Sequence, residues 1–323
     1  MPLRPIDCVA EESSKMKRDE VAPRGAMEAW PGLSPYARSL EASGNGDRLF
    51  YFDSRQQGRR ALILIHGLGD EADSWRHIFP LLAPRYRLLA PDLPGFGRST
   101  VHGRTSLGRC AKAVLELMAA EELSSAVLVG SSLGAAVAQR VASMAPSKVS
   151  SLVFVDGGWP AAGGGDGSLL FSLLPFRGER RYTAYRRDHE AAVRSLAPYY
   201  ADFDALPESD RSFLARRVID RVESDGQRRA YFSLYRSAVL WVLFRRTSFR
   251  AGLAGFDRPL LVAWGSEDRI LSAATAELLC SIAPRARSFL LEGAGHLPQQ
   301  ERPEELAAAI EAFLDDADAP GIG

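Results

Sequence analysis

The sequence predicts an α/β protein in which a mostly parallel sheet carries helices on both faces and a helical insertion. Short apolar runs alternate with amphipathic segments over residues 46–156 and again over residues 259–318. This alternation is typical of sheets built from strand–helix–strand units. Between the two stretches, residues 157–258 show only helical periodicity, so we expect them to form a separate helical cap.

A strand that turns directly into a helix lies near the middle of the chain. Residues 126–129 form a short apolar run typical of a buried parallel strand, and residues 135–144 have the pattern of a helix. Residues 130–134 between them read Gly-Ser-Ser-Leu-Gly. A serine at the centre of a G-x-S-x-G turn stands clear of the sheet at the start of a helix. We therefore predict that Ser132 is a nucleophile.

The other elements of the first half follow in order. Residues 1–45 are polar and broken by Pro and Gly, so we expect a flexible N-terminal extension with one short helix near residues 26–30. Residues 48–53 are predicted to form an edge strand. Buried strands are expected at residues 61–65, 86–90 and 149–155, the last ending at Asp156, and an amphipathic helix is expected over residues 106–121.

The alternation resumes after the insertion. We expect strands at residues 260–264 and 286–291, with a helix over residues 272–282 between them and a final helix over residues 303–315. The insertion leaves the sheet and returns to it near the carboxyl ends of strands. Because open α/β sheets bind ligands at that edge, the cap is expected to cover the ligand site.

Composition narrows the functional class. The 40 basic and 40 acidic residues cancel, which gives no support for a nucleic-acid partner. Cys8, Cys110 and Cys280 are too far apart for a disulfide framework or a zinc motif, which favours a reducing compartment. The N-terminus has no apolar run of signal-peptide length, and no stretch is long enough to span a bilayer. We therefore expect a cytoplasmic protein without a membrane partner, and the oligomeric state is not predicted.

Four motifs, in this order and spacing, resemble the α/β-hydrolase superfamily. They are His-Gly-Leu-Gly at residues 66–69, Asp-Leu-Pro-Gly-Phe-Gly-Arg-Ser at 92–99, the serine turn at 130–134, and Trp-Gly-Ser-Glu-Asp at 264–268 with Gly-Ala-Gly-His at 293–296. The resemblance covers roughly residues 48–315. It is closest to the cap-bearing branch of serine esterases and carbon–carbon bond hydrolases. Relatives that cleave epoxides or haloalkanes use Asp as nucleophile, whereas this chain has Ser132.

A serine nucleophile needs a base and an acid that orients the base. His296, in the loop after the last strand, is the candidate base. Asp268 is the candidate acid because it gives the chain order Ser, Asp, His expected for this fold. Asp156 is the rival acid, since it also ends a strand and some family members place the acid there. Glu267 is adjacent to Asp268 but is expected to point elsewhere.

The family pattern also implies the oxyanion donors, namely the backbone N–H groups of Leu68 and Leu133. His66 and Asp92 are expected to be structural loop residues. No metal or organic cofactor is implied. The leading functional hypothesis is a serine hydrolase that cleaves a small apolar ester or related acyl substrate, with short to medium acyl groups preferred. The alternatives are a carbon–carbon bond hydrolase acting on a meta-cleavage product and a non-catalytic ligand-binding protein.

Overall fold

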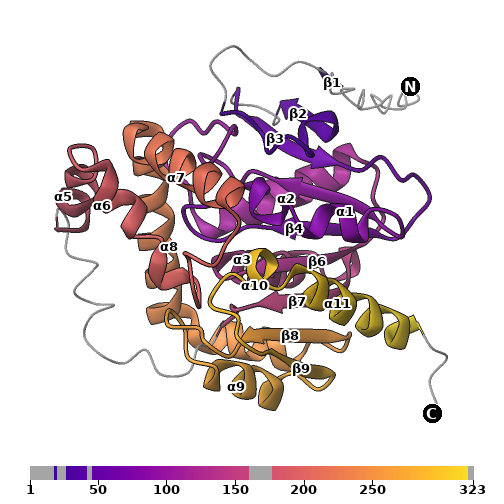
Figure 1. The fold of residues 1–323 in the computed structure, drawn as a ribbon. Helices are drawn as coiled ribbons and strands as arrows, with labels where there is room; N and C mark the ends of the chain where they lie inside the picture. The colour runs from indigo at the N-terminus through magenta and orange to yellow at the C-terminus, as the bar shows by residue number, and fades with distance from the viewer. Residues whose placement is uncertain (1–17, 20–26, 42–45, 160–176, 319–323) are drawn as a thin grey trace, which may run out of the picture.

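The computed structural model describes residues 18–19, 27–41, 46–159 and 177–318, and these form a nine-stranded sheet flanked by helices (Figure 1). The strands are β1 (Arg18–Asp19), β2 (Ala37–Glu41), β3 (Arg48–Asp53), β4 (Ala61–Ile65), β5 (Arg87–Pro91), β6 (Ala126–Ser131), β7 (Val149–Val155), β8 (Leu260–Gly265) and β9 (Ala286–Leu291). Their order in the sheet is β1-β2-β3-β5-β4-β6-β7-β8-β9. The run from β5 to β9 is parallel, and β1, β2 and β3 join it antiparallel.

Alternate residues of the strands face two separate layers of helices. One layer contains α2 (Leu107–Ala120), α3 (Leu133–Met144) and α9 (Ala274–Ile282), which pack on strand residues such as Ile63 and Leu128. The other contains α1 (Ile78–Leu82) and α11 (Pro303–Asp318), which pack on the neighbouring residues Leu62 and Val127. Side chains one residue apart point to opposite faces of a strand, so strands covered on both faces are apolar throughout. The predicted α/β fold with helices on both faces is confirmed.

The helical segment α5–α8 lies at one side of the sheet in Figure 1. It consists of α5 (Arg177–Ala184), α6 (His189–Arg194), α7 (Glu208–Glu223) and α8 (Asp225–Ala254), with a short 3₁₀ turn at Ala197–Tyr199. It meets loops that follow strands. A side chain on Gly69, after β4, would press on Tyr231, and one on Gly295, after β9, would overlap the backbone of Tyr200. These contacts place the segment over the carboxyl ends of the parallel strands.

Two expectations differ from the structure. The strand β3 is not at an edge, because it pairs with β2 on one side and β5 on the other. Residues 27–41, expected within a flexible extension, pack against the domain: Leu33 and Leu40 are buried, and β2 extends the sheet. Residues 27–30 are not helical. The prediction was wrong because β2 lies near the edge of the sheet and has only one buried position, so its sequence is mostly polar. The rest of the predicted extension, residues 1–17, 20–26 and 42–45, lies outside the described residues.

The remaining helices are short. They are the 3₁₀ turns at Ser34–Tyr36, Ala72–Trp75 and Pro146–Lys148, and α10 (Pro298–Glu301) before α11. Among the described residues, no helix combines the length and the apolar character that a bilayer-crossing helix requires.

Candidate active site

Ser132 lies in the strained turn between β6 and α3. Its backbone has φ 52° and ψ −119°, in the positive-φ region that a non-glycine residue rarely adopts. The flanking glycines make the turn possible. A side chain on Gly130 would overlap the backbone of Gly134, and one on Gly134 would overlap the carbonyl of Ile65 on the neighbouring strand. The turn therefore projects the Ser132 hydroxyl beyond the end of the sheet.

The structure brings Ser132, His296 and Asp268 into one hydrogen-bonded series. The Ser132 Oγ lies 2.9 Å from His296 Nε2, and His296 Nδ1 lies 2.9 Å from Asp268 Oδ2. The side chains of His296 and Asp268 are only 2% and 1% exposed. A carboxylate can only accept, so Nδ1 carries the imidazole proton and Nε2 is left to accept the proton of the serine hydroxyl.

Asp268 is held in its ionised form. Burial alone would raise its pKa, but the hydrogen bond and charge of His296 outweigh burial and leave the pKa below its usual range. The backbone N–H groups of Ile270 and Leu271 donate to Oδ1 at 2.7 and 3.0 Å and act in the same direction. The carboxylate is thus fixed in place and able to orient the imidazole.

His296 is also held by a hydrogen bond from its backbone and by a neighbouring aromatic ring. The His296 N–H donates to the carbonyl of Tyr199 at 2.8 Å, and the two rings lie 5.9 Å apart. Because Tyr199 belongs to the segment between α6 and α7, the helical segment contributes directly to the position of the candidate base.

Asp156, the rival acid, does not contact the imidazole in the way Asp268 does. It follows β7 with φ 46°, and its Oδ1 accepts the backbone N–H of Gly265 at 2.9 Å. Burial, together with the neighbouring negative charge of Asp268, raises its pKa well above the ordinary value. The structure therefore pairs His296 with Asp268 and places Asp156 beside the pair.

The loop after β4 borders the other side of Ser132. A Cβ on Gly67 would lie 3.2 Å from the Ser132 Cβ, a tight contact, so glycine eases the close approach of this loop. Leu68 follows Gly67, and Leu133 is the first residue of α3, where helix N–H groups have no partner within the helix. Both predicted backbone donors thus belong to segments that adjoin the serine.

His66 holds this loop and is not a second base. Its Nε2 accepts the backbone N–H of Leu93 at 2.8 Å, and its Nδ1 lies 2.8 Å from the Gly67 carbonyl, to which it can donate. Complete burial lowers its pKa. A neutral ring with both nitrogens engaged joins the loop after β4 to the loop after β5.

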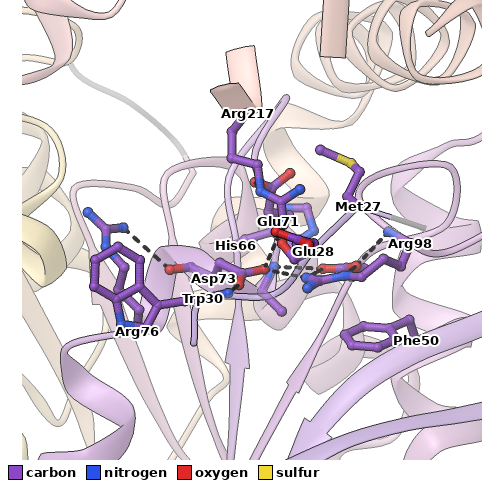
Figure 2. A network of polar contacts seen from close by, with 12 residues as sticks. Met27, Glu28, Trp30, Phe50, His66, Glu71, Asp73, Arg76, Arg98 and Arg217 are labelled. Carbon is purple, nitrogen blue, oxygen red and sulfur yellow. Dashed lines mark hydrogen bonds and ion pairs between the residues drawn. The ribbon is translucent and has the colours of Figure 1, made fainter. Parts of the chain in front are cut away.

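A buried ionic cluster lies beyond this loop, formed by Glu71, Asp73, Asp92, Arg98 and Arg217. Figure 2 shows four of these residues, Glu71, Asp73, Arg98 and Arg217. Arg98 pairs with Asp92 at 2.8 Å and with Asp73, while Arg217 of α7 pairs with Glu71 at 3.1 Å. Arg217 also donates to the carbonyl of Glu28. The ionic cluster thus joins the helical segment and residues 27–30 to the loop that leads away from Ser132.

Sequence reasoning missed several residues that support the site. A side chain on Gly157 would overlap the Ser132 backbone, so the glycine after Asp156 is needed for close packing. Gln299 is fully buried and donates to Ser131 Oγ at 3.1 Å, so the hydroxyl next to Ser132 accepts a buried hydrogen bond. The Gly-Gly sequence after β7 could have indicated the close packing at Gly157, but no local pattern in the sequence marks Gln299.

Metal binding at the site would compete with the hydrogen bonds already formed. Within the described parts of the chain, Asp156, Asp268 and His296 are the group of possible ligands close enough to share an ion. The nitrogen and oxygen that Asp268 and His296 direct at each other are already bonded. The arrangement is therefore suited to moving a proton from a serine hydroxyl to an imidazole.

Comparison with known proteins identifies the fold family. Residues 60–303 match the family model described as alpha/beta hydrolase fold. A pimeloyl-[acyl-carrier protein] methyl ester esterase of Edwardsiella ictaluri is 31% identical over 80% of this chain and 94% of its own. Lipase 3 of a Moraxella species is 28% identical over 84% of this chain and 82% of its own.

A solved structure shows the same fold. The 2-hydroxy-6-oxo-6-phenylhexa-2,4-dienoate hydrolase of a Rhodococcus strain superposes with a TM-score of 0.69 at 23% identity, covering 84% of this chain and 96% of its own. The family model matches most of the chain, and the esterase relative is matched over nearly its whole length. The chain therefore belongs to the α/β-hydrolase fold family.

Proposed function

We propose that this protein is a serine hydrolase that cleaves a carboxylic ester or related acyl substrate through an acyl-enzyme. The observation that carries the proposal is the 2.9 Å contact between Ser132 Oγ and His296 Nε2. The name of the Edwardsiella relative describes an esterase that acts on a methyl ester, which supports the ester class.

In the proposed mechanism, Ser132 Oγ attacks the carbonyl carbon while His296 Nε2 takes the hydroxyl proton. The backbone N–H groups of Leu68 and Leu133 would stabilise the oxyanion, and Asp268 would stabilise the imidazolium. His296 then returns the proton to the leaving alkoxide, which departs as an alcohol. Water repeats the sequence on the acyl-enzyme, and the carboxylic acid leaves.

We further propose that residues 157–258, of which residues 160–176 lie outside the described part of the chain, act as a cap on a core formed by residues 46–156 and 259–318. Tyr199 and Tyr231 of the helical segment approach His296 and the loop of Gly69. A covered serine excludes bulk water and limits the length of the acyl group. Apolar acyl groups are favoured because burying an unpaired polar group costs about 1–3 kcal/mol.

The test is a panel of aryl esters from acetyl to palmitoyl. We expect kcat/KM to be highest for short to medium acyl groups and to fall for long ones. The rate should not jump when one substrate exceeds its solubility. This control is needed because α8 exposes Leu240, Leu243 and Phe244, and apolar surfaces can dock on an oil phase. A maximum at palmitoyl, or a jump at phase separation, would contradict the specificity cap.

The alternatives are separated in the same assay. Bleaching of a coloured meta-cleavage product without turnover of any ester would identify a carbon–carbon bond hydrolase. Absence of turnover for both substrate classes, together with measurable binding, would identify a ligand-binding protein.

A further inference from the structure

Asp156 is a buried carboxyl beside the triad that the proposed mechanism does not use. The residue is fully buried and has φ 46°, a strained conformation for a side chain of this kind. Strain of this kind persists only where the surrounding structure enforces it. Here the enforcing contacts are the Asp156 N–H to the Ala263 carbonyl at 3.0 Å and the Gly265 N–H to Asp156 Oδ1 at 2.9 Å.

The contacts around the second carboxyl oxygen of Asp156 bear on whether this group carries a proton. Asp156 Oδ2 is buried and meets no donor among the described residues. Asp156, Asp268 and His296 each place one polar atom within 4.8 Å of the others, so the Asp156 carboxyl lies beside the negative charge of Asp268. Two buried carboxylates this close repel each other, and a proton on one of them removes the repulsion and can be donated to the other.

The proton belongs on Asp156. Asp268 already receives a hydrogen bond from His296 at Oδ2 and two backbone N–H groups at Oδ1, all of which favour its ionised form. Asp156 receives one hydrogen bond and is more deeply buried. Glu301 of α10 is also acidic, and its charge favours the neutral form of Asp156 as well.

On the basis of the triad proposed above, we propose that Asp156 is a neutral carboxylic acid that donates a hydrogen bond to Asp268 and thereby positions the acid of the triad. It is a positioning residue because it acts on His296 only through Asp268. The hydrogen bond spreads the negative charge of Asp268, so the imidazolium is stabilised less. The protonated form of His296 therefore gains less from Asp268 than it would from an undisturbed carboxylate.

Two substitutions separate this role from simple packing. In Asp156→Asn, the amide oxygen can accept from the Gly265 N–H and the amide NH₂ can donate to Asp268, as the neutral acid does. Asp156→Ala removes the donor. We expect the acid limb of the kcat/KM profile to stay in place for Asp156→Asn, with at most a few-fold loss of rate. For Asp156→Ala, the limb should move to higher pH by about half a unit to one unit.

An infrared measurement tests the proton without relying on activity. With ¹³C-labelled aspartate in the wild-type protein, the carbonyl band of a protonated carboxylic acid should persist at pH 7, where exposed carboxyls near pKa ~4 are ionised. The band should be absent from Asp156→Asn and present in Ser132→Ala. Thermal unfolding curves check that the variants are folded.

Three results would overturn the proposal: no protonated band at pH 7, a band that survives in Asp156→Asn, or a pH profile of Asp156→Ala that superimposes on that of the wild type. A protein that keeps the band but retains full activity in Ser132→Ala would instead refute the proposed function. The two failures are therefore distinguishable.

Discussion

The two buried polar clusters of this protein differ in how their carboxyl groups are compensated. In the ionic cluster, Asp92 and Asp73 face Arg98, and Glu71 faces Arg217. Beside Ser132, Asp268 faces His296, and in the described structure neither Asp268 nor Asp156 has an arginine or lysine within ion-pair distance. Both clusters lie near the edge of the sheet that carries Ser132. The carboxyl groups of one are paired with arginines, whereas those of the other lie beside a histidine.

The difference follows from whether the positively charged partner of the carboxyl groups can lose its proton near neutral pH. A guanidinium stays charged at any pH that the fold survives, so an arginine always favours the ionised form of the carboxyl groups beside it. An imidazole can gain and lose a proton near neutral pH. The ionic cluster is therefore suited to joining segments, whereas the group around His296 is suited to moving a proton. Substitutions should affect activity in one cluster and stability in the other.

The largest effect is expected at the nucleophile. Ser132→Ala removes the hydroxyl that His296 contacts, and kcat should fall by about 10⁴ or more, as when other serine triads are disabled. Labelling by a fluorophosphonate should disappear, and peptide mapping of the wild type should place the label on Ser132. Thermal stability should change little, because the side chain is half-buried and small.

Ser131 is the matched control, since it lies next to Ser132 and also carries a hydroxyl. That hydroxyl accepts from Gln299 and does not contact His296, so Ser131→Ala should keep most of the activity. If Ser132→Ala is still labelled, or Ser131→Ala is the inactive variant, the assignment of the nucleophile is wrong.

A smaller effect is expected at the acid. Asp268→Asn should lower kcat by about a thousandfold, because an amide can donate to Nδ1 and thereby favour the wrong tautomer of the base. Asp156→Asn should be mild, as argued above. Measuring both rates in one assay tests the pairing seen in the structure. An inactive Asp156→Asn with an active Asp268→Asn would assign the acid to the end of β7.

Much of this site could be predicted from local sequence. The glycines around Ser132 mark a turn that requires close approach of a strand and a helix, and the fold prediction from alternating apolar runs is confirmed. The sequence favoured Asp268 over Asp156 through the family pattern, not through any local contact. Both residues follow neighbouring strands, and only the three-dimensional arrangement shows which carboxyl reaches His296.

Asp92 was expected to be a structural loop residue, but the ion pairs of the ionic cluster were not predicted. Its members come from the loops after β4 and β5 and from α7, so residues 146 positions apart in the sequence meet, as with Glu71 and Arg217. In the sequence, Arg217 is one of many arginines on a helical segment. Such pairs depend on how the helical segment docks, which periodicity does not specify.

The smallest effect is expected at Glu71, and it concerns stability. Burial outweighs the nearby charges of Arg221 and Arg217 and raises the pKa of Glu71 to about 7. The ordinary value is lower, so the folded state binds a proton here that the unfolded chain has lost. The favourable contribution is therefore complete in acid and disappears as the pH rises through about 7.

Glu71→Gln replaces this group with a permanently neutral one of the same shape. At pH 5 the variant and the wild type should have similar free energies of unfolding, whereas at pH 8 the variant should be more stable by up to about 3 kcal/mol. Urea unfolding at both pH values measures this difference. Glu190→Gln, whose side chain is 84% exposed, is the control and should show no such trend. A variant that is less stable than the wild type at pH 8 would show that the ion pair with Arg217 outweighs burial, and that the ionic cluster is held by a fully charged Glu71.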